Sequence, residues 1–186
     1  MDALELIKKR RTIRKFQQRR IRQCVLEGCL EAARLAPSAM NLQPLEYILV
    51  TEQLERIFSC TRWAGYEKEA GPKPGEEPVA YIIILMNRSV SSDAAYDVGL
   101  AAENILLSAL GAGIASCVLG ALDRPKLAKA MGIPATHSIE LAIALGYPKQ
   151  RSVVEDGKDL KYRVDSKGIV HIPKRPLQSI VHNERF

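Results

Sequence analysis

An arginine-rich segment near the amino terminus is the part of this sequence best suited to bind an anion. Residues 8–22, KKRRTIRKFQQRRIR, contain nine Lys or Arg residues and no Asp or Glu. The whole chain of 186 residues has 27 basic and 21 acidic residues, which gives a net charge of +6. Ten basic and four acidic residues fall within residues 1–34, so the remaining chain is neutral overall.

Because the excess positive charge is confined to one short segment, it indicates which kind of anion the segment binds. A protein that coats nucleic acid non-specifically usually spreads Lys and Arg over a broad face, because affinity grows with the number of phosphates neutralised. One short basic run on an otherwise neutral chain favours a smaller anion. We therefore expect no nucleic-acid partner, with a nucleic-acid-binding arm as the alternative.

The usual signatures of a self-sufficient catalytic site are missing. The glycine-rich stretch GAGIASC at 111–117 has Ser116 where the third glycine of GxGxxG would fall, and it follows a predicted helix instead of a strand. The sequence contains neither GxxxxGK[ST] nor GxSxG. An anion site without a visible nucleophile or base indicates that a bound cofactor performs the chemistry.

Cysteine and histidine give no sign of a metal site. Cysteines stand at 24, 29, 60 and 117 without a CxxC pair, and no histidine lies at metal-ligand spacing from them. We expect reduced thiols and no metal. The three histidines, at 137, 171 and 182, are expected to be structural or exposed.

Composition predicts one domain over residues 1–186, because 47% of the residues are hydrophobic and can bury a substantial core. Met1 is followed by Asp2 and further charges, which argues against a signal peptide. The longest apolar stretches are too short or too interrupted to span a bilayer. We expect a cytoplasmic protein with no membrane partner.

Helical and strand-like patterns alternate along the chain. Apolar residues at helical spacing predict helices at 21–36 and 93–110, the second apolar nearly all round and expected to be buried. A third helix is predicted at 123–132, with Asp123 as its N-cap and Gly132 after its end. Strands are predicted at 46–51, 114–120 and 138–146, and a strand covered on both faces is predicted at 79–86. The other predicted segments are a short helix at 52–60, a Pro/Gly-rich loop at 70–78 and a hairpin at 162–172. The tail at 175–186 is expected to lie on another surface.

Five segments, taken together, resemble the FMN-dependent nitroreductase family and its small members. They occur in the family's order and approximate spacing: RRTIRKF (10–16), EAARLAPSAMNLQPLEYILV (31–50), DVGLAAENILLSALGAGIASCVLGALD (97–123), ALGYP (144–148) and KRPLQSIVHNERF (174–186). The resemblance implies an α+β, nitroreductase-like fold with a mainly antiparallel central sheet flanked by helices. It also implies a homodimer with FMN at the interface and an exchanged C-terminal extension.

The same resemblance implies which residues bind FMN. The amino-terminal segment that grips the phosphate and ribityl end corresponds to Arg10, Arg11, Thr12 and Arg14, and a C-terminal basic position corresponds to Lys174 and Arg175. Forked guanidinium donors fit phosphate oxygens well. A loop presented by the partner subunit corresponds to Pro37, Ser38, Ala39, Asn41 and Gln43, and the turn whose amide faces flavin N5 corresponds to Leu119, Gly120 and Ala121. Arg19, Arg20 and Arg22 lie outside the motif and are expected to form a solvated flank.

Two departures from the family pattern concern the flavin environment. Ala39 stands where many relatives have a second Ser, and Leu45-Glu46-Tyr47 stands where many have Trp-x-Phe. We expect altered affinity or substrate shape without loss of the fold, although Leu45 and Tyr47 can equally be ordinary strand packing. Trp63, Ala64, Gly65 and Tyr66 fall where small members cover the substrate side, or they only pack.

The resemblance implies an oxidoreductase in which NADH or NADPH gives a hydride to flavin N5. A small-molecule acceptor, such as a nitroaromatic or a quinone, then takes the electrons. No catalytic acid or base is assigned. The alternatives are a specialised dehalogenating or flavin-fragmenting enzyme of the same fold, and a non-catalytic flavin- or nucleic-acid-binding protein.

Overall fold

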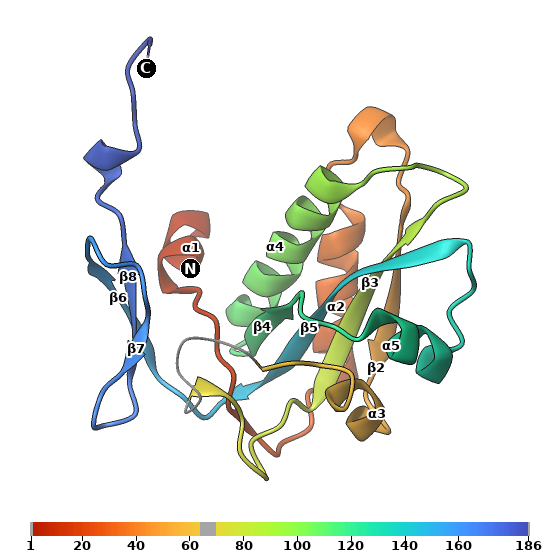
Figure 1. Ribbon diagram of the computed structural model, residues 1–186, viewed down its shortest axis with the longest axis horizontal. Helices are drawn as coiled ribbons and strands as arrows, with labels where there is room; N and C mark the ends of the chain where they lie inside the picture. Colours follow the sequence, from red (N-terminus) through yellow and green to blue (C-terminus); the bar gives the residue numbers. More distant parts are fainter. Residues whose placement is uncertain (1, 64–69, 186) are drawn as a thin grey trace.

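A computed structural model describes residues 2–63 and 70–185 (Figure 1). Its helices are α1 (Ala3–Lys9), α2 (Gln23–Arg34), α3 (Leu54–Phe58), α4 (Ala95–Gly111) and α5 (Arg124–Met131), with short 3₁₀ turns η1 (Ala39–Asn41) and η3 (Leu177–Ser179). Its strands are β1 (Phe16–Gln17), β2 (Leu45–Val50), β3 (Ala80–Asn87), β4 (Ala115–Leu119), β5 (His137–Pro148), β6 (Ser152–Asp156), β7 (Arg163–Val164) and β8 (Val170–Lys174).

The central sheet is antiparallel throughout. Its order is β1-β5-β3-β2, and β4 pairs with β5 as well. The long strand β5 therefore joins β3 to β4 and β1. This arrangement confirms the predicted α+β fold with a mainly antiparallel sheet flanked by helices.

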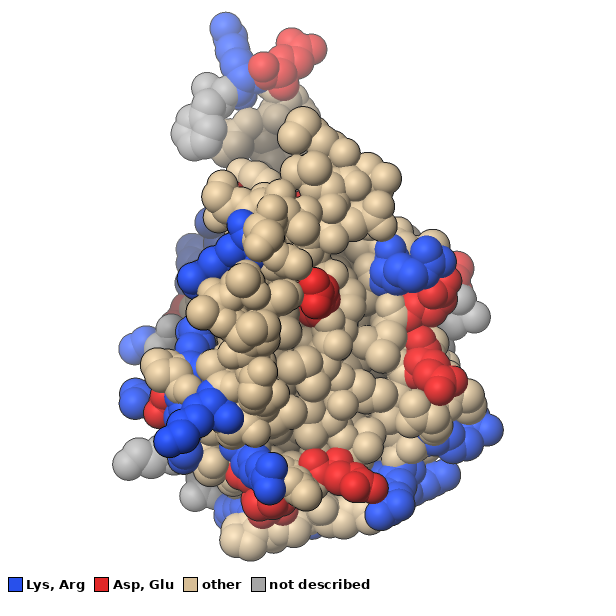
Figure 2. Space-filling view, turned by 90° about the vertical axis from the view of Figure 1, so that its right-hand side faces the viewer, with Lys and Arg blue, Asp and Glu red and all other residues tan. Residues whose placement is uncertain are grey.

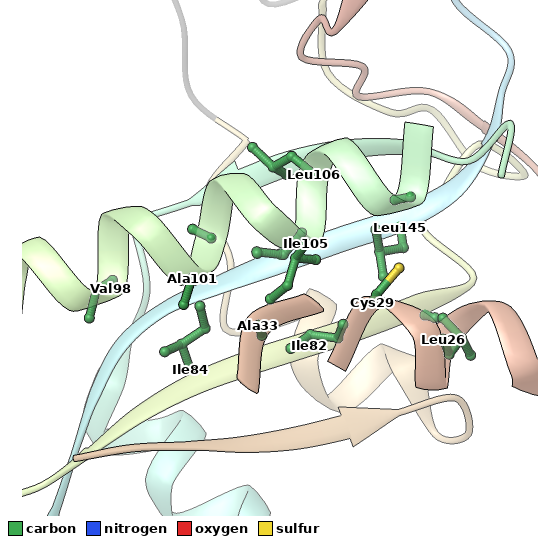
Figure 3. Packing of buried hydrophobic residues seen from close by; sticks show 14 of the residues in the cluster. Leu26, Cys29, Ala33, Ile82, Ile84, Val98, Ala101, Ile105, Leu106 and Leu145 are labelled. Carbon is green, nitrogen blue, oxygen red and sulfur yellow. The ribbon is translucent and has the colours of Figure 1, made fainter. Parts of the chain in front are cut away.

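The two faces of the sheet are covered by different helices. Ile82 and Ile84 of β3 pack with α2 and α4, where Leu26, Ala101 and Ile105 meet them (Figure 3). The alternate β3 residues, such as Ile83, pack on the other face with α3 and α5. Since every β3 residue from Ala80 to Met86 is buried, the prediction of a strand covered on both faces is confirmed.

Helix α4 is buried along one side only. Its sheet-facing residues are buried, but Tyr96 is 84% exposed and Leu100 is 46% exposed. The apolar residues that predicted a buried helix are themselves buried, apart from the half-buried Leu110, so the expectation is met on that side of α4. Figure 2 shows the side of the molecule that lies on the right in Figure 1, and a broad part of that face carries no Lys, Arg, Asp or Glu.

The C-terminal segment forms a second, three-stranded sheet of order β6-β8-β7. The antiparallel pair β7–β8 confirms the hairpin predicted at 162–172, while β6 pairs with β8 in parallel. Residues 175–185 beyond it are exposed and extend away from the central sheet (Figure 1). Among the described residues, no helix combines the length and apolarity needed to cross a membrane.

Candidate functional site

The segment that follows α1 is anchored beside β4. Thr12 pairs with Ser116 in an isolated parallel bridge, and the amide of Ile13 donates to the carbonyl of Ser116 at 3.0 Å. Ile13 is buried in the core, so the segment is held by packing as well as by hydrogen bonds. These contacts fix the predicted arginine segment at the edge of the central sheet.

Arg14 has a guanidinium nitrogen that is buried without a hydrogen-bond partner. Its backbone amide donates to Oε1 of Gln150 at 3.1 Å, and its guanidinium carbon lies 5.1 Å from the centre of the Tyr162 ring. Within residues 2–63 and 70–185, nothing accepts a hydrogen bond from Nη1 of Arg14. Burying a charged donor without an acceptor is costly, so this nitrogen is the best candidate among the described residues for contact with an anion.

The two preceding arginines already have contacts within the chain. Nε of Arg10 lies 3.4 Å from Oε1 of Glu103 on α4, and Nη1 of Arg11 donates to the carbonyl of Arg10. Burial, followed by the charge of Arg10, lowers the pKa of Arg11. Two neighbouring cations that repel each other are stabilised by a bound anion.

The turn at Gly120 and Ala121 faces open space. Leu119 ends β4 and is buried, whereas Gly120 and Ala121 are exposed. The amide of Arg62 donates to the carbonyl of Ala121 at 3.0 Å, which holds the turn in place. A methyl group at Gly120 would meet no atom within 4 Å, so packing within this chain does not require glycine there.

Arg14 and this turn line one cavity of about 120 Å³. Its other lining residues are Arg62, Trp63, Cys117, Val118 and Leu119. Burial raises the pKa of the Cys117 thiol to about 11, with Arg14 opposing the shift, so the thiol stays neutral at physiological pH. Nε1 of Trp63 is also buried, and no described residue accepts its hydrogen bond. Trp63 lines this cavity and also packs against the Phe58 ring, with the ring centres 6.0 Å apart, while Ala64, Gly65 and Tyr66 are outside the described residues.

The loop at 37–43 has an unusual backbone that is fastened to α4. Met40, Asn41 and Gln43 adopt left-handed φ angles of 49°, 55° and 51°. The hydroxyl of Ser38 donates to Oδ2 of Asp97 at 2.6 Å and accepts from the amide of Gln43 at 2.9 Å. Such backbone conformations cost energy in residues other than glycine, and they persist only where surrounding contacts enforce them.

Asp97 is a residue that the sequence analysis missed. It is 5% exposed in the first turn of α4, and it also accepts from the amide of Ala39 at 3.2 Å. Its only local signal is a single acid at the start of an apolar helix. Leu45 and Tyr47 lie beside it and pack on the core, which fits their interpretation as strand packing. Burial, followed by the charge of Asp97, raises the pKa of Tyr47.

One chain does not bring all predicted site residues together. The loop at 37–43 contacts the start of α4, whereas the segment after α1 runs to the other end of that helix (Figure 1). Lys174 and Arg175 are exposed at the end of β8, where the guanidinium of Arg175 donates to the carbonyl of Ser179 at 2.9 Å. The chain therefore has one group of site residues at 10–14 and 119–121, a second at 37–43, and a third at 174–175.

These features coincide with a known family. The model of the Nitroreductase family matches residues 7–147, which include the arginine segment, the loop at 37–43 and the turn at 119–121. The chain belongs to this family. The predicted family is thereby confirmed.

Relatives and solved structures agree with this assignment. A protein of Methanothermobacter thermautotrophicus, provisionally named NADH dehydrogenase/NAD(P)H nitroreductase, is 33% identical over 84% of this chain and 82% of its own. An iodotyrosine deiodinase of Thermotoga neapolitana is 25% identical over 77% of this chain and 87% of its own. The solved structure of an FMN-dependent nitroreductase from Clostridium difficile has a TM-score of 0.73 and 24% identity, covering 99% of this chain and 100% of its own.

Proposed function

We propose that this family member is an FMN-dependent oxidoreductase that takes electrons from NADH or NADPH and passes them to nitroaromatic, quinone or similar acceptors. The observation that carries the proposal is the buried Nη1 of Arg14, which has no hydrogen-bond partner among the described residues, in a residue that lines the same cavity as the turn at Gly120. A cofactor with an anionic end and a flat polar ring would satisfy both features. The relative named NAD(P)H nitroreductase supports this choice of chemistry.

The arginine segment would hold the phosphate end of FMN. Arg14 supplies a donor that has no acceptor among the described residues, and Arg10 and Arg11 add positive charge beside it. Arginine suits this role because its forked donors match phosphate oxygens and its charge persists at any physiological pH. Thr12 contributes through its pairing with Ser116, which holds the segment in position.

The turn at 119–121 would face the reactive edge of the flavin. When bound, FMN supplies N5 as the atom that accepts and returns a hydride. Gly120 leaves room for close approach of a ring, because no atom lies within 4 Å of where its side chain would be. Since Cys117 beside this turn stays a neutral thiol, the chain offers no thiolate nucleophile here.

The remaining contacts would come from a second copy of the chain. A cavity of about 120 Å³ in one chain encloses only part of a molecule as large as FMN, and the loop at 37–43 lies elsewhere in the same chain. Exposed apolar side chains on α4, η1 and the tail give such a partner surface to cover: Met40, Tyr96, Leu100, Leu177, Ile180 and Val181. We therefore propose a homodimer in which the partner presents its loop to the flavin and its tail, with Lys174 and Arg175, closes the assembly.

The experiment that tests the proposal is absorption spectroscopy of the purified protein. We expect the two visible bands of oxidised flavin, which bleach under nitrogen on addition of NADH or NADPH and return when a nitroaromatic or quinone is added. Reversed-phase chromatography of the released cofactor should give FMN. A colourless protein that neither retains added FMN nor oxidises NADH or NADPH would contradict the proposal.

A dehalogenase of the same fold is the second candidate. The observation that favours it is the similarity to an iodotyrosine deiodinase over 77% of this chain. Release of iodide from iodotyrosine by the dithionite-reduced protein would distinguish it from a nitroreductase. The specialised role is excluded if iodide release is no faster than with free reduced FMN.

A further inference from the structure

Arg62 lies where two hollows in the protein surface meet. Its amide donates to the carbonyl of Ala121, and the neighbouring Thr61 pairs with Leu122 in an antiparallel bridge. The amide of Asp123 donates to the carbonyl of Cys60 at 2.8 Å, so residues 60–62 are fastened to the turn after β4 over three positions. The backbone of Arg62 is therefore fixed beside the proposed flavin-facing turn.

Arg62 is a lining residue of both hollows. One is the cavity of about 120 Å³ that contains Arg14 and Trp63. The other is a groove of about 490 Å³ whose lining also includes Leu122, Asp123, Arg124 and Pro125. Ala121 and Arg62 are shared by the two linings, so the groove adjoins the cavity beside the turn that would face the flavin.

The other charged groups of this groove are already engaged. Asp123 caps α5 and accepts from the amide of Lys126 at 3.1 Å. The guanidinium of Arg124 donates to the carbonyls of Ile139 and Glu140 at 2.8 and 2.9 Å. For Arg62, no carboxylate of the described residues lies within ion-pair distance, and its side chain is exposed. Among the described residues, then, no carboxylate neutralises its positive charge at the groove.

We propose that Arg62 is a specificity-determining residue that selects substrates with an oxyanion, either a phosphate of the dinucleotide donor or a carboxylate of an aromatic acceptor. This inference rests on the proposed function, because it takes the turn at 119–121 as the reacting edge of the site. A guanidinium at the mouth of the groove can form forked hydrogen bonds with either anion while the reacting ring reaches inward. Neutral substrates gain nothing from it.

The test compares Arg62→Gln with the unaltered protein on matched charged and neutral substrates. The acceptor pair is para-nitrobenzoate and para-nitrobenzamide, and the donor pair is NADPH and benzyl-dihydronicotinamide, which has no phosphate. We expect kcat/KM to fall by about fivefold to tenfold for at least one charged substrate and by less than about twofold for its neutral counterpart. Arg62→Lys, which keeps the charge but loses the fork, should recover part of the loss. Arg56→Gln on α3, outside both hollows, is the control.

The outcomes separate the possible sources of the anion. A loss confined to para-nitrobenzoate assigns the carboxylate of the acceptor, and a loss confined to the dinucleotide assigns the phosphate of the donor. Equal losses on charged and neutral substrates, or no loss on any, overturn the proposal.

A binding measurement keeps this result separate from the proposed function. Trp63 is the single tryptophan of the chain and lies in the same cavity as Arg62, so its fluorescence should report a ligand there. Arg62→Gln should weaken quenching by para-nitrobenzoate or NADPH relative to the neutral partner, even in a protein without turnover. Selective quenching without turnover would leave the role of Arg62 intact and contradict only the proposed oxidoreductase activity. Unselective quenching with normal turnover would contradict the role of Arg62 and leave the proposed activity intact.

Discussion

The hydroxyl of Ser38 donates to Oδ2 of Asp97 at 2.6 Å, and this bond fastens a loop with three left-handed residues to the first turn of α4. Asp97 is nearly buried and accepts a second bond from the amide of Ala39. A buried carboxylate is expensive unless it is well hydrogen-bonded, so its presence indicates that the loop conformation matters. Ser38 is therefore committed to holding the loop, whereas Asn41 and Gln43 are exposed, with Nε2 of Gln43 donating to the carbonyl of Asn41 at 3.3 Å.

Asp97→Asn should weaken FMN binding without unfolding the protein. The amide side chain cannot accept from both Ser38 and Ala39, and losing a charged hydrogen bond costs about 1.5–3 kcal/mol. We expect the dissociation constant of FMN, measured by quenching of flavin fluorescence, to rise about tenfold. Because Ser38→Ala breaks the same contact, the double variant should be little worse than either single variant. Additive effects of the two substitutions would show that the residues act separately.

Arg14→Glu should give a folded protein that purifies without flavin. The substitution removes the unpartnered donor and places a negative charge where an anion is expected, so FMN affinity should fall by at least about 100-fold. Arg20→Glu is the control, because Arg20 is an exposed arginine outside the motif. The flavin content per chain measures FMN binding, and circular dichroism checks that the variant is folded. Full occupancy in Arg14→Glu would remove Arg14 from the site.

Two defective variants should restore each other if the loop acts on the partner's flavin. The first is Arg14→Glu, and the second is Asn41→Gly with Gln43→Gly, since glycine tolerates the left-handed backbone at both positions. In a two-fold symmetric heterodimer, one site carries both defects and the other carries none. With random pairing, co-expression should recover about a quarter of the FMN sites of the unaltered protein. Recovery no greater than the average of the two separate variants would place the loop and Arg14 in the same subunit's site.

The elements whose signals are local were predictable from the sequence. Helix α5 begins at the predicted cap Asp123, which accepts from the amide of Lys126, and ends at Gly132 with a φ of 65°. The run of isoleucines in β3 is covered on both faces as expected. By contrast, α1 and β6 were not predicted. Helix α1, capped by Asp2, is only seven residues long and buries none of them, and β6 is defined by its pairing with β8, 18 residues further along the chain.

The site was predictable only in part, because contacts between residues far apart in the chain leave no local signal in the sequence. The sequence and the family resemblance indicated the arginines at 10–14, but not that Arg10 contacts Glu103 while Nη1 of Arg14 finds no acceptor in residues 2–63 and 70–185. In the sequence, Asp97 looks like an ordinary acidic residue of a helix. Its role depends on Ser38, which is 59 residues away in the chain and is brought beside it by the fold. Arg62 gives no signal at all before the bridge to Leu122 sets it at the mouth of the cavity.

Gly146→Ala should destabilise the fold. An added methyl would lie 2.7–2.9 Å from three atoms of Phe16, whose side chain is completely buried and cannot move aside. Overpacking of this kind costs about 1–3 kcal/mol, which lowers the midpoint of thermal unfolding by roughly 2–10 °C for a chain of this size. Gly28→Ala on α2 is the matched control, because a methyl there meets no atom within 4 Å. Since alanine is the better helix former by about 1 kcal/mol, the control should raise the midpoint, and a rise in Gly146→Ala as well would contradict the packing argument.

His171 should make the stability of the C-terminal sheet depend on pH. Its Nε2 lies 3.1 Å from Asp165 and its Nδ1 lies 2.9 Å from Glu155, while Arg163 on β7 acts against its protonation. The bonds to Asp165 and then Glu155 raise the pKa of His171 above its usual 6.5. A raised histidine pKa stabilises the folded state fully below about pH 6.5, and that contribution is lost as pH rises through the folded-state pKa.

The carboxylates of Glu155 and Asp165 make the stability depend on pH in the acidic range. The bond to His171 is the main cause that lowers the pKa of Glu155 below 4.5, and the amide of Ile169 is the main cause for Asp165, below 3.8. Their contribution is present above these values and is lost as pH falls through the lowered values. The difference in thermal unfolding midpoint between the unaltered protein and His171→Gln should therefore peak at about pH 4.5–6.5 and shrink toward pH 9. His182→Gln in the exposed tail is the control, and a difference that grows with rising pH would show that His171 is not held in its charged form by these carboxylates.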